Sequence, residues 1–174
     1  MDIYISLLVT MLFSAFFSGM EIAFVSVDKL RFEMERSSGL TSRILSVFFK
    51  HPNEFISTML VGNNIALVIY GILMAQIIGD NLLAGLISNH FLMVLAQTVI
   101  STLIILVTGE FLPKNIFKIN PNLVLNLFAL PLIVCYVLLY PISKFASGVS
   151  CLFLRVFGIK MNKETSDIAF GKVD

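Results

Sequence analysis

Three long apolar runs constrain this chain more than any other feature of its sequence. They extend from Ile3 to about Val27, from about Phe55 to Ile78 and from about Phe91 to Leu112. Each is close to the roughly 20 residues that a helix needs to cross the hydrocarbon core of a bilayer. Of the 174 residues, 57% are hydrophobic and 13% are charged, which excludes a water-soluble single domain. We therefore expect an all-α membrane protein.

A fourth apolar segment, from Leu123 to Tyr140, is ambiguous. It is long enough to cross, but Pro121, Pro131 and Pro141 punctuate it. A proline removes a helix hydrogen bond and clashes with the preceding turn. The positions of the basic residues distinguish the alternatives, because short cytoplasmic loops are enriched in Lys and Arg.

All twelve basic residues fall on one face of the membrane if three segments cross and the fourth does not. Five lie between the first two spans, two follow the third span, and five follow the fourth segment. We therefore predict three crossings in a multi-pass protein of the inner (plasma) membrane, with the N-terminus outside and the C-terminus in the cytoplasm. The segment at 122–140 is expected to be broken, to pack against the bundle and to return to the inner face.

Two further stretches are amphipathic and are expected at the inner face. Residues 28–53 carry a turn signal at Ser37-Ser38-Gly39 and a break at His51-Pro52, which favours two short helices. Apolar residues recur with a helical period from about Ser143 to Phe157, which favours an interfacial helix and leaves a tail helix of the bundle as the alternative. Residues 1–158 would then form a transmembrane domain with a juxtamembrane belt at 122–157. The polar residues 159–174 would form a linker.

Carboxylates within the spans are candidates for function, because a charge at the bilayer centre costs about 2.5–3.5 kcal/mol on insertion scales. Glu110 lies near the inner end of the third span, and Glu21 lies in the first. The alternative for both is a helix-end carboxylate that reaches the interface or pairs with Lys114.

Hydroxyl, amide and glycine residues accompany these carboxylates. Ser14 and Ser18 are four residues apart and share one helix face, and Gly19 is expected to loosen the turn there and free carbonyl oxygens. The run Gly62-Asn63-Asn64 supplies amide oxygens in the second span, and Gly109 allows close backbone approach in the third. The alternative is that Ser and Asn join helices and that Gly is a packing contact.

These groups form a donor set of oxygen alone. One carboxylate, an amide, two hydroxyls and exposed carbonyls suit hard cations such as Mg²⁺, Ca²⁺ or Na⁺. Mg²⁺ usually keeps several waters, so a site with one carboxylate and few protein ligands suits it. Cys135 and Cys151 have no Cys or His at ligand spacing and are interpreted as small hydrophobes. The net charge is +1 and the sequence has no cluster of basic residues of the kind that binds nucleic acid.

Three motifs follow one another along the spans: Phe16-Phe17-Ser18-Gly19-x-Glu21-x-Ala23, then Gly62-Asn63, then Gly109-Glu110-x-x-Pro113-Lys114. Together they resemble the transmembrane domain of the CorC/CNNM magnesium transporters over roughly residues 1–158. The resemblance implies three crossings with a juxtamembrane belt helix, a homodimer, and Mg²⁺ transport out of the cytoplasm coupled to Na⁺.

The same resemblance implies a central Mg²⁺ held by Ser14, Asn63 and Glu110 with Gly109, and it makes Ser18 a further candidate ligand. Full members of the family continue into a cytosolic pair of CBS domains that bind adenine nucleotide. The linker at 159–174 would lead toward such a pair.

Three classes of function compete for this sequence. The first is a cation transporter, and the second is a membrane anchor or scaffold for cytosolic CBS modules. The third is an intramembrane enzyme, but the chain has no pair of intramembrane aspartates, no Gly-x-Ser-x-Gly and no His-Glu-x-x-His. We therefore expect a transporter rather than an enzyme and keep the scaffold as the alternative.

Overall fold

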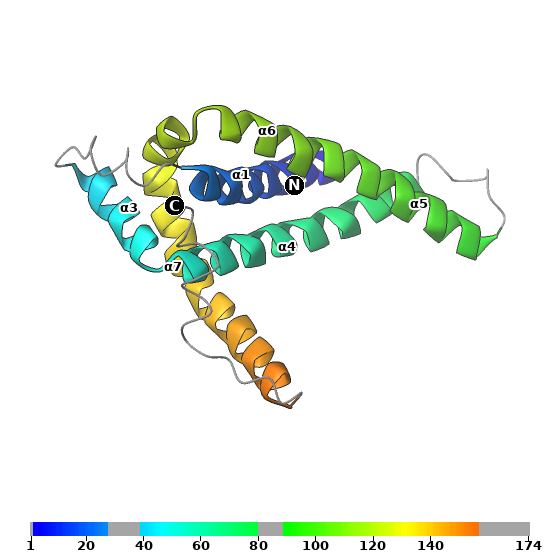
Figure 1. Cartoon of the computed structure of the whole chain (residues 1–174). Coiled ribbons are helices and arrows are strands. Elements are labelled where there is room, and N and C mark those ends of the chain that lie inside the picture. The colour runs from blue at the N-terminus through cyan, green and yellow to red at the C-terminus, as the bar shows by residue number, and fades with distance from the viewer. Residues whose placement is uncertain (1, 28–38, 80–88, 157–174) are drawn as a thin grey trace.

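The computed structural model describes residues 2–27, 39–79 and 89–156 (Figure 1). Within these ranges the chain forms helices and no strand. The predicted linker at 159–174 and part of the predicted inner-face segment lie outside the described residues. The helices are α1 (Ile3–Ser26), α3 (Leu40–Lys50), α4 (Pro52–Ile77), α5 (His90–Ile105), the π-helical segment η2 (Leu106–Phe111), α6 (Leu112–Ile119) and α7 (Pro121–Val156).

Four helical stretches among the described residues are long and apolar enough to cross a membrane, judged by length and composition alone. They are α1, α4, the continuous stretch His90–Ile119, and Pro121–Phe153 of α7. Large apolar side chains such as Leu12, Val68 and Leu103 are exposed on them, as they are where the surrounding solvent is lipid. In lipid a helix satisfies all its backbone hydrogen bonds within itself. The prediction of an all-α membrane protein is confirmed.

Figure 1 shows how these helices are arranged. α1 lies between α4 and the α5–α6 stretch, and it packs against both. α7 runs across one end of this group, and α3 lies beside it there. Most of the buried side chains of α7 lie in its first half, and Ser143 is buried as well. The described side chains after Lys144 are exposed.

The third apolar stretch continues past its predicted end at Leu112. Pro113 lies in the first turn of α6 rather than ending the helix. Immediately before it, the Leu112 N–H donates to the Val107 carbonyl in the wider hydrogen-bonding pattern of η2. A local π-helical turn is one of the adjustments by which membrane helices accommodate a proline. The helix therefore continues about two turns beyond the predicted end of the span.

α7 is one uninterrupted helix, although a break was predicted at 122–140. Pro131 and Pro141 both lie inside it, and the helix continues to Val156. The predicted interfacial helix at 143–157 is therefore the end of α7 rather than a separate element. Membrane helices tolerate internal prolines better than soluble ones, because neighbouring helices and local adjustments satisfy the freed carbonyl groups.

α1 also differs from expectation, because it is regular across Ser18 and Gly19. The loosened turn predicted there is absent. Gly19 instead provides the space for Phe117 of α6, since a methyl group at Gly19 would overlap the Phe117 ring. The glycine is needed for helix contact and not for backbone freedom.

An aromatic cluster joins α7 and α3 to the ends of α1 and α4. The Phe55 ring lies 4.3 Å from that of Phe24 and 4.8 Å from that of Phe48, centre to centre. Tyr136 of α7 packs on Phe48 at 5.0 Å. Such pairs contribute about 0.5–1.5 kcal/mol each beyond their buried area. The cluster fixes the end of the bundle that α7 crosses.

Candidate functional site

Ser14 and Asn63 meet in the middle of the bundle. The Ser14 hydroxyl of α1 donates to the Asn63 Oδ1 of α4 at 2.8 Å, and both side chains are buried. Hydrogen bonds of this kind between membrane helices contribute only about 0.6 kcal/mol on average. The pair therefore adds little to stability beyond what apolar packing would give, while it places two oxygen atoms at membrane depth.

Gly109 brings the third helix against this pair. A methyl group built on Gly109 would lie 3.2 Å from the Ser14 Oγ and 2.6 Å from the Ile105 Cδ1. Gly109 is buried and lies within η2. The wide turns of π-helical segments recur at functional sites. Residues of α1, α4 and η2 thus converge at one point.

Ser18 lies one turn beyond Ser14 on the same face of α1. Its side chain is fully buried, and its hydroxyl oxygen has no hydrogen-bond partner. A buried hydroxyl without a partner costs about 1–3 kcal/mol. A ligand that bound to the Ser18 oxygen would offset that cost.

Glu110 lies beside this cluster and faces a different space. It lines a cavity of about 250 Å³ between α4 and the α5–η2 stretch, together with Tyr70, Ser101 and Thr102. The Tyr70 hydroxyl donates to the Ser101 carbonyl at 3.4 Å. The structure therefore brings together Ser14, Asn63 and Gly109, with Ser18 one turn away and Glu110 on the neighbouring face of η2.

Glu21 lies in a group of charges that includes Glu110 and Lys114. It interacts electrostatically with Lys114 of α6 and with Glu110. Glu21 and Lys114 are both half-buried where α1 packs on α6. This arrangement fits the alternative interpretation of Glu21 as a carboxylate near a helix end that has Lys114 for a counter-charge.

The donor atoms gathered here are hydroxyl, amide and carboxylate oxygens. Among the described residues, no group of three His, Cys, Asp or Glu side chains is placed to hold a metal. Carboxylate, carbonyl and water oxygens suit Mg²⁺, Ca²⁺ and Mn²⁺, whereas sulfur and imidazole suit softer metals. These oxygen donors would suit a hard cation.

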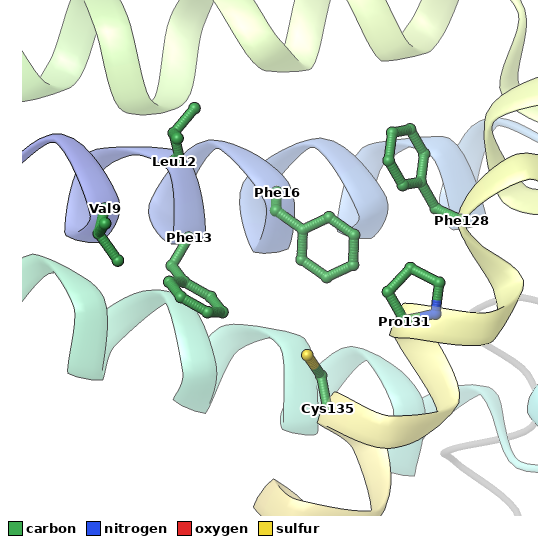
Figure 2. A pocket seen from close by; sticks show the side chains of 7 residues that line it. All are labelled: Val9, Leu12, Phe13, Phe16, Phe128, Pro131 and Cys135. Atoms are coloured by element: carbon green, nitrogen blue, oxygen red, sulfur yellow. The ribbon is translucent and has the colours of Figure 1, made fainter.

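A second hollow in the structure has a different character. Figure 2 shows a pocket of about 270 Å³ between α1 and α7, where rings from both helices face one another. It is lined by Val9, Leu12, Phe13, Phe16, Phe128, Pro131 and Cys135. None of these side chains carries an oxygen or a charge, so this pocket offers nothing to a cation.

Sequence reasoning missed the residues that share the cavity with Glu110. Tyr70 is almost fully buried, and it lies seven residues after Asn63 on the same face of α4. A tyrosine in the middle of an apolar span is a signal that could have found it. Ser101 and Thr102 gave no such signal, because Ser and Thr are common throughout membrane helices.

A family model and known proteins match this chain. Residues 5–169 match the family model described as the cyclin M transmembrane N-terminal domain. The chain is 27% identical over 150 residues to the UPF0053 inner membrane protein YfjD of Escherichia coli, covering 84% of this chain and 33% of that protein. It is 27% identical over 150 residues to the UPF0053 protein MG146 homolog of Mycoplasma pneumoniae, covering 83% of this chain and 34% of that protein. The chain thus spans about a third of the length of these relatives.

Proposed function

Since this chain belongs to the family of cyclin M transmembrane domains, we propose that it carries Mg²⁺ across the membrane through the cluster at Ser14, Asn63 and Gly109. The observation that supports the proposal most strongly is the convergence of three helices on this cluster, with the unpaired Ser18 hydroxyl one turn away. Polar groups inside a membrane are costly, and they mark ion pathways where they face the bundle interior.

Each residue has a distinct role in this proposal. Ser14, Ser18 and Asn63 replace some of the waters around the ion with their own oxygens. Gly109 lets the η2 backbone come close to Ser14, where a larger residue would not fit. Glu110 supplies the negative charge that offsets the charge of the ion.

The remaining features of the proposal concern assembly and direction. We propose a homodimer in the inner membrane, with the N-terminus outside, that exports Mg²⁺ from the cytoplasm in exchange for Na⁺. The greater length of the relatives leaves room for the cytosolic CBS pair that the family resemblance implies. Because α1 is regular at Gly19, the wide turn of η2 is the better place for the movement that exposes the ion to one side and then the other.

Calorimetric titration of the purified chain with Mg²⁺, Ca²⁺ and Mn²⁺ tests the proposal. We expect saturable Mg²⁺ binding that Asn63→Ala and Glu110→Gln abolish or weaken at least about tenfold, since the first removes an oxygen ligand and the second removes the negative charge assigned to the ion. Asn64→Ala is a matched control, because Asn64 is exposed on α4 beside the buried Asn63. Mg²⁺ flux into vesicles should follow the same order.

The scaffold alternative gives the opposite result. If Asn63→Ala and Glu110→Gln leave binding and flux unchanged in a protein that still folds, the cluster only joins helices. Wild-type protein that neither binds nor moves Mg²⁺ would likewise refute transport by this domain. Far-UV circular dichroism of each variant shows whether the helices remain.

A further inference from the structure

Four of the eight residues that line the cavity beside Glu110 have oxygen-bearing side chains, and the other four are Leu67, Gly71, Ile105 and Leu106. Tyr70 closes one wall and is only 1% exposed, and Ser101 is 9% exposed. Tyr70, Ser101, Thr102 and Glu110 bring phenol, hydroxyl, backbone carbonyl and carboxylate oxygens to its walls. No nitrogen or sulfur side chain belongs to this set of four, so the cavity has the donor chemistry of a hard cation.

The size of the cavity indicates how such a cation would be held. Its volume of about 250 Å³ corresponds to roughly eight water molecules at about 30 Å³ each. A dehydrated ion would leave most of this space empty. The cavity is open on one side, and an ion that keeps much of its first water shell has room in it.

The cavity is distinct from the cluster at Ser14 and Asn63, although the two are neighbours. Gly109 faces Ser14, whereas the next residue, Glu110, lines the cavity. Successive residues of a helix point in different directions, so η2 separates the two spaces. Glu110 is the acidic residue among those that line the cavity.

We propose that this cavity is a second cation site, which takes a hydrated hard cation against Tyr70, Thr102 and Glu110. The proposal rests on the proposed transport function, in which Glu110 also serves the ion at Ser14 and Asn63. One carboxylate offsets the charge of one ion at a time, so occupancy of either site weakens binding at the other. This mutual weakening is a negative coupling, and the coupling is the same in both directions.

Tyrosine-sensitised Tb³⁺ luminescence tests the second site directly. Tb³⁺ is a hard, oxygen-ligated cation, and the chain has four Tyr and no Trp, so sensitised emission identifies a nearby Tyr. We expect emission that is lost in Tyr70→Phe and in Glu110→Gln and is weakened in Thr102→Val. Adding Mg²⁺ or Na⁺ to the Asn63→Ala variant, which lacks a ligand of the first site, should quench it, and comparing the two ions shows which one the cavity takes.

Two matched controls carry the same chemical changes outside the cavity. Tyr140→Phe removes the hydroxyl of a tyrosine on α7, and Thr98→Val removes a hydroxyl that donates to the Val94 carbonyl on the exposed side of α5. Both should keep wild-type emission. Emission that survives Tyr70→Phe, or wild-type protein without any Tyr70-dependent emission, would overturn the proposal.

Asn63→Ala separates this proposal from the transport function. We expect it to lose the heat of Mg²⁺ binding and to retain Tyr70-dependent Tb³⁺ emission. If Asn63→Ala abolishes both signals together, there is one site and the second-site proposal fails. If wild-type protein shows the emission but no heat with Mg²⁺, the second site stands and the proposed function fails.

Discussion

At the scale of single residues, a missing side chain sets the distance between two helices. Gly19 of α1 has no Cβ, and the Phe117 ring of α6 occupies the space that a Cβ would take. Gly62 of α4 is similar, because a methyl group there would lie 2.7 Å from the Leu139 Cδ1. Small residues at such contacts let membrane helices approach closely and gain dispersion energy. The glycines of the motifs are thus explained by packing before any ligand is considered.

Replacing Gly19 by Ala should therefore destabilise the protein. The overlap with the Phe117 ring forces α1 and α6 apart, and overpacking of this kind costs about 1–3 kcal/mol. Thermal unfolding in detergent, followed by circular dichroism, measures the change. Gly148→Ala is the control, because a methyl group there has nothing within 4 Å, and it should leave stability unchanged or raise it. Equal melting temperatures for Gly19→Ala and wild type would contradict the role of this contact.

At the scale of elements, α7 is held to the bundle by two kinds of contact. Lys144 of α7 forms an ion pair with Glu54 of α4 at 2.9 Å, and Tyr140 donates to the same carboxylate at 3.3 Å. The two charged side chains are 54% and 37% exposed, and exposed ion pairs contribute about 0–1 kcal/mol. The aromatic cluster around the fully buried Phe55 contributes several times more. Its rings therefore hold α7 in place, and the ion pair refines its position.

These magnitudes predict an order of effects that chemical denaturation can measure. Phe55→Ala should lower the free energy of unfolding by about 3–5 kcal/mol, because it leaves a cavity among closely packed rings. Glu54→Gln should lower it by about 1 kcal/mol or less. The double variant Glu54→Lys with Lys144→Glu exchanges the two charges, and it should recover most of the free energy of unfolding that Glu54→Gln loses. A larger loss for Glu54→Gln than for Phe55→Ala would refute this ranking.

The sequence predicted whole helices better than their ends or their partners. The bounds of α1 and α4 lie within about three residues of the predicted ones, because an apolar run of membrane-spanning length is a strong signal by itself. Pro131 and Pro141 misled, since proline inside a membrane helix is tolerated where neighbouring helices satisfy the freed carbonyl groups. Those neighbours are not visible in the local sequence.

The sequence indicated which types of residue form the candidate site, but not which of them contact one another. Ser14 and Asn63 stand out as polar groups in apolar runs, but they are 49 positions apart, and only the packing of α1 on α4 shows that they meet. The separation of Glu110 from this pair depends on which way η2 turns. A wide turn of this kind has no local sequence signal as plain as that of an apolar run.

At the scale of the whole molecule, charge is distributed unevenly along the helix bundle. α1 begins at Ile3 without a basic residue before it, whereas α3 ends at Lys50 next to the start of α4. The basic stretch between the first two spans is expected to stay in the cytoplasm. The two ends of the bundle should therefore be reachable from opposite sides of the membrane.

Cysteine labelling checks this orientation. In a chain with Cys135 and Cys151 replaced by Ala, a membrane-impermeant maleimide should modify Asp2→Cys in right-side-out vesicles and Lys50→Cys in inside-out vesicles. Asp2 and Lys50 are both exposed, so access depends on the side of the membrane alone. Modification of both positions from one side would contradict the orientation.

The wide turn of η2 also bears on how this stretch of the gene tolerates changes of length. A π-helical turn holds one residue more than an α-helical turn, so loss of one codon between 106 and 111 would convert η2 into ordinary α-helix. The α-helical turn completes the same rotation with one residue fewer, so α6 would keep its face toward α1 and Phe117 would stay in the space at Gly19. The deletion would instead change the directions in which the residues of η2 itself point, Gly109 and Glu110 among them. A one-codon deletion here would thus alter the candidate site and leave the helix packing on either side of it in place.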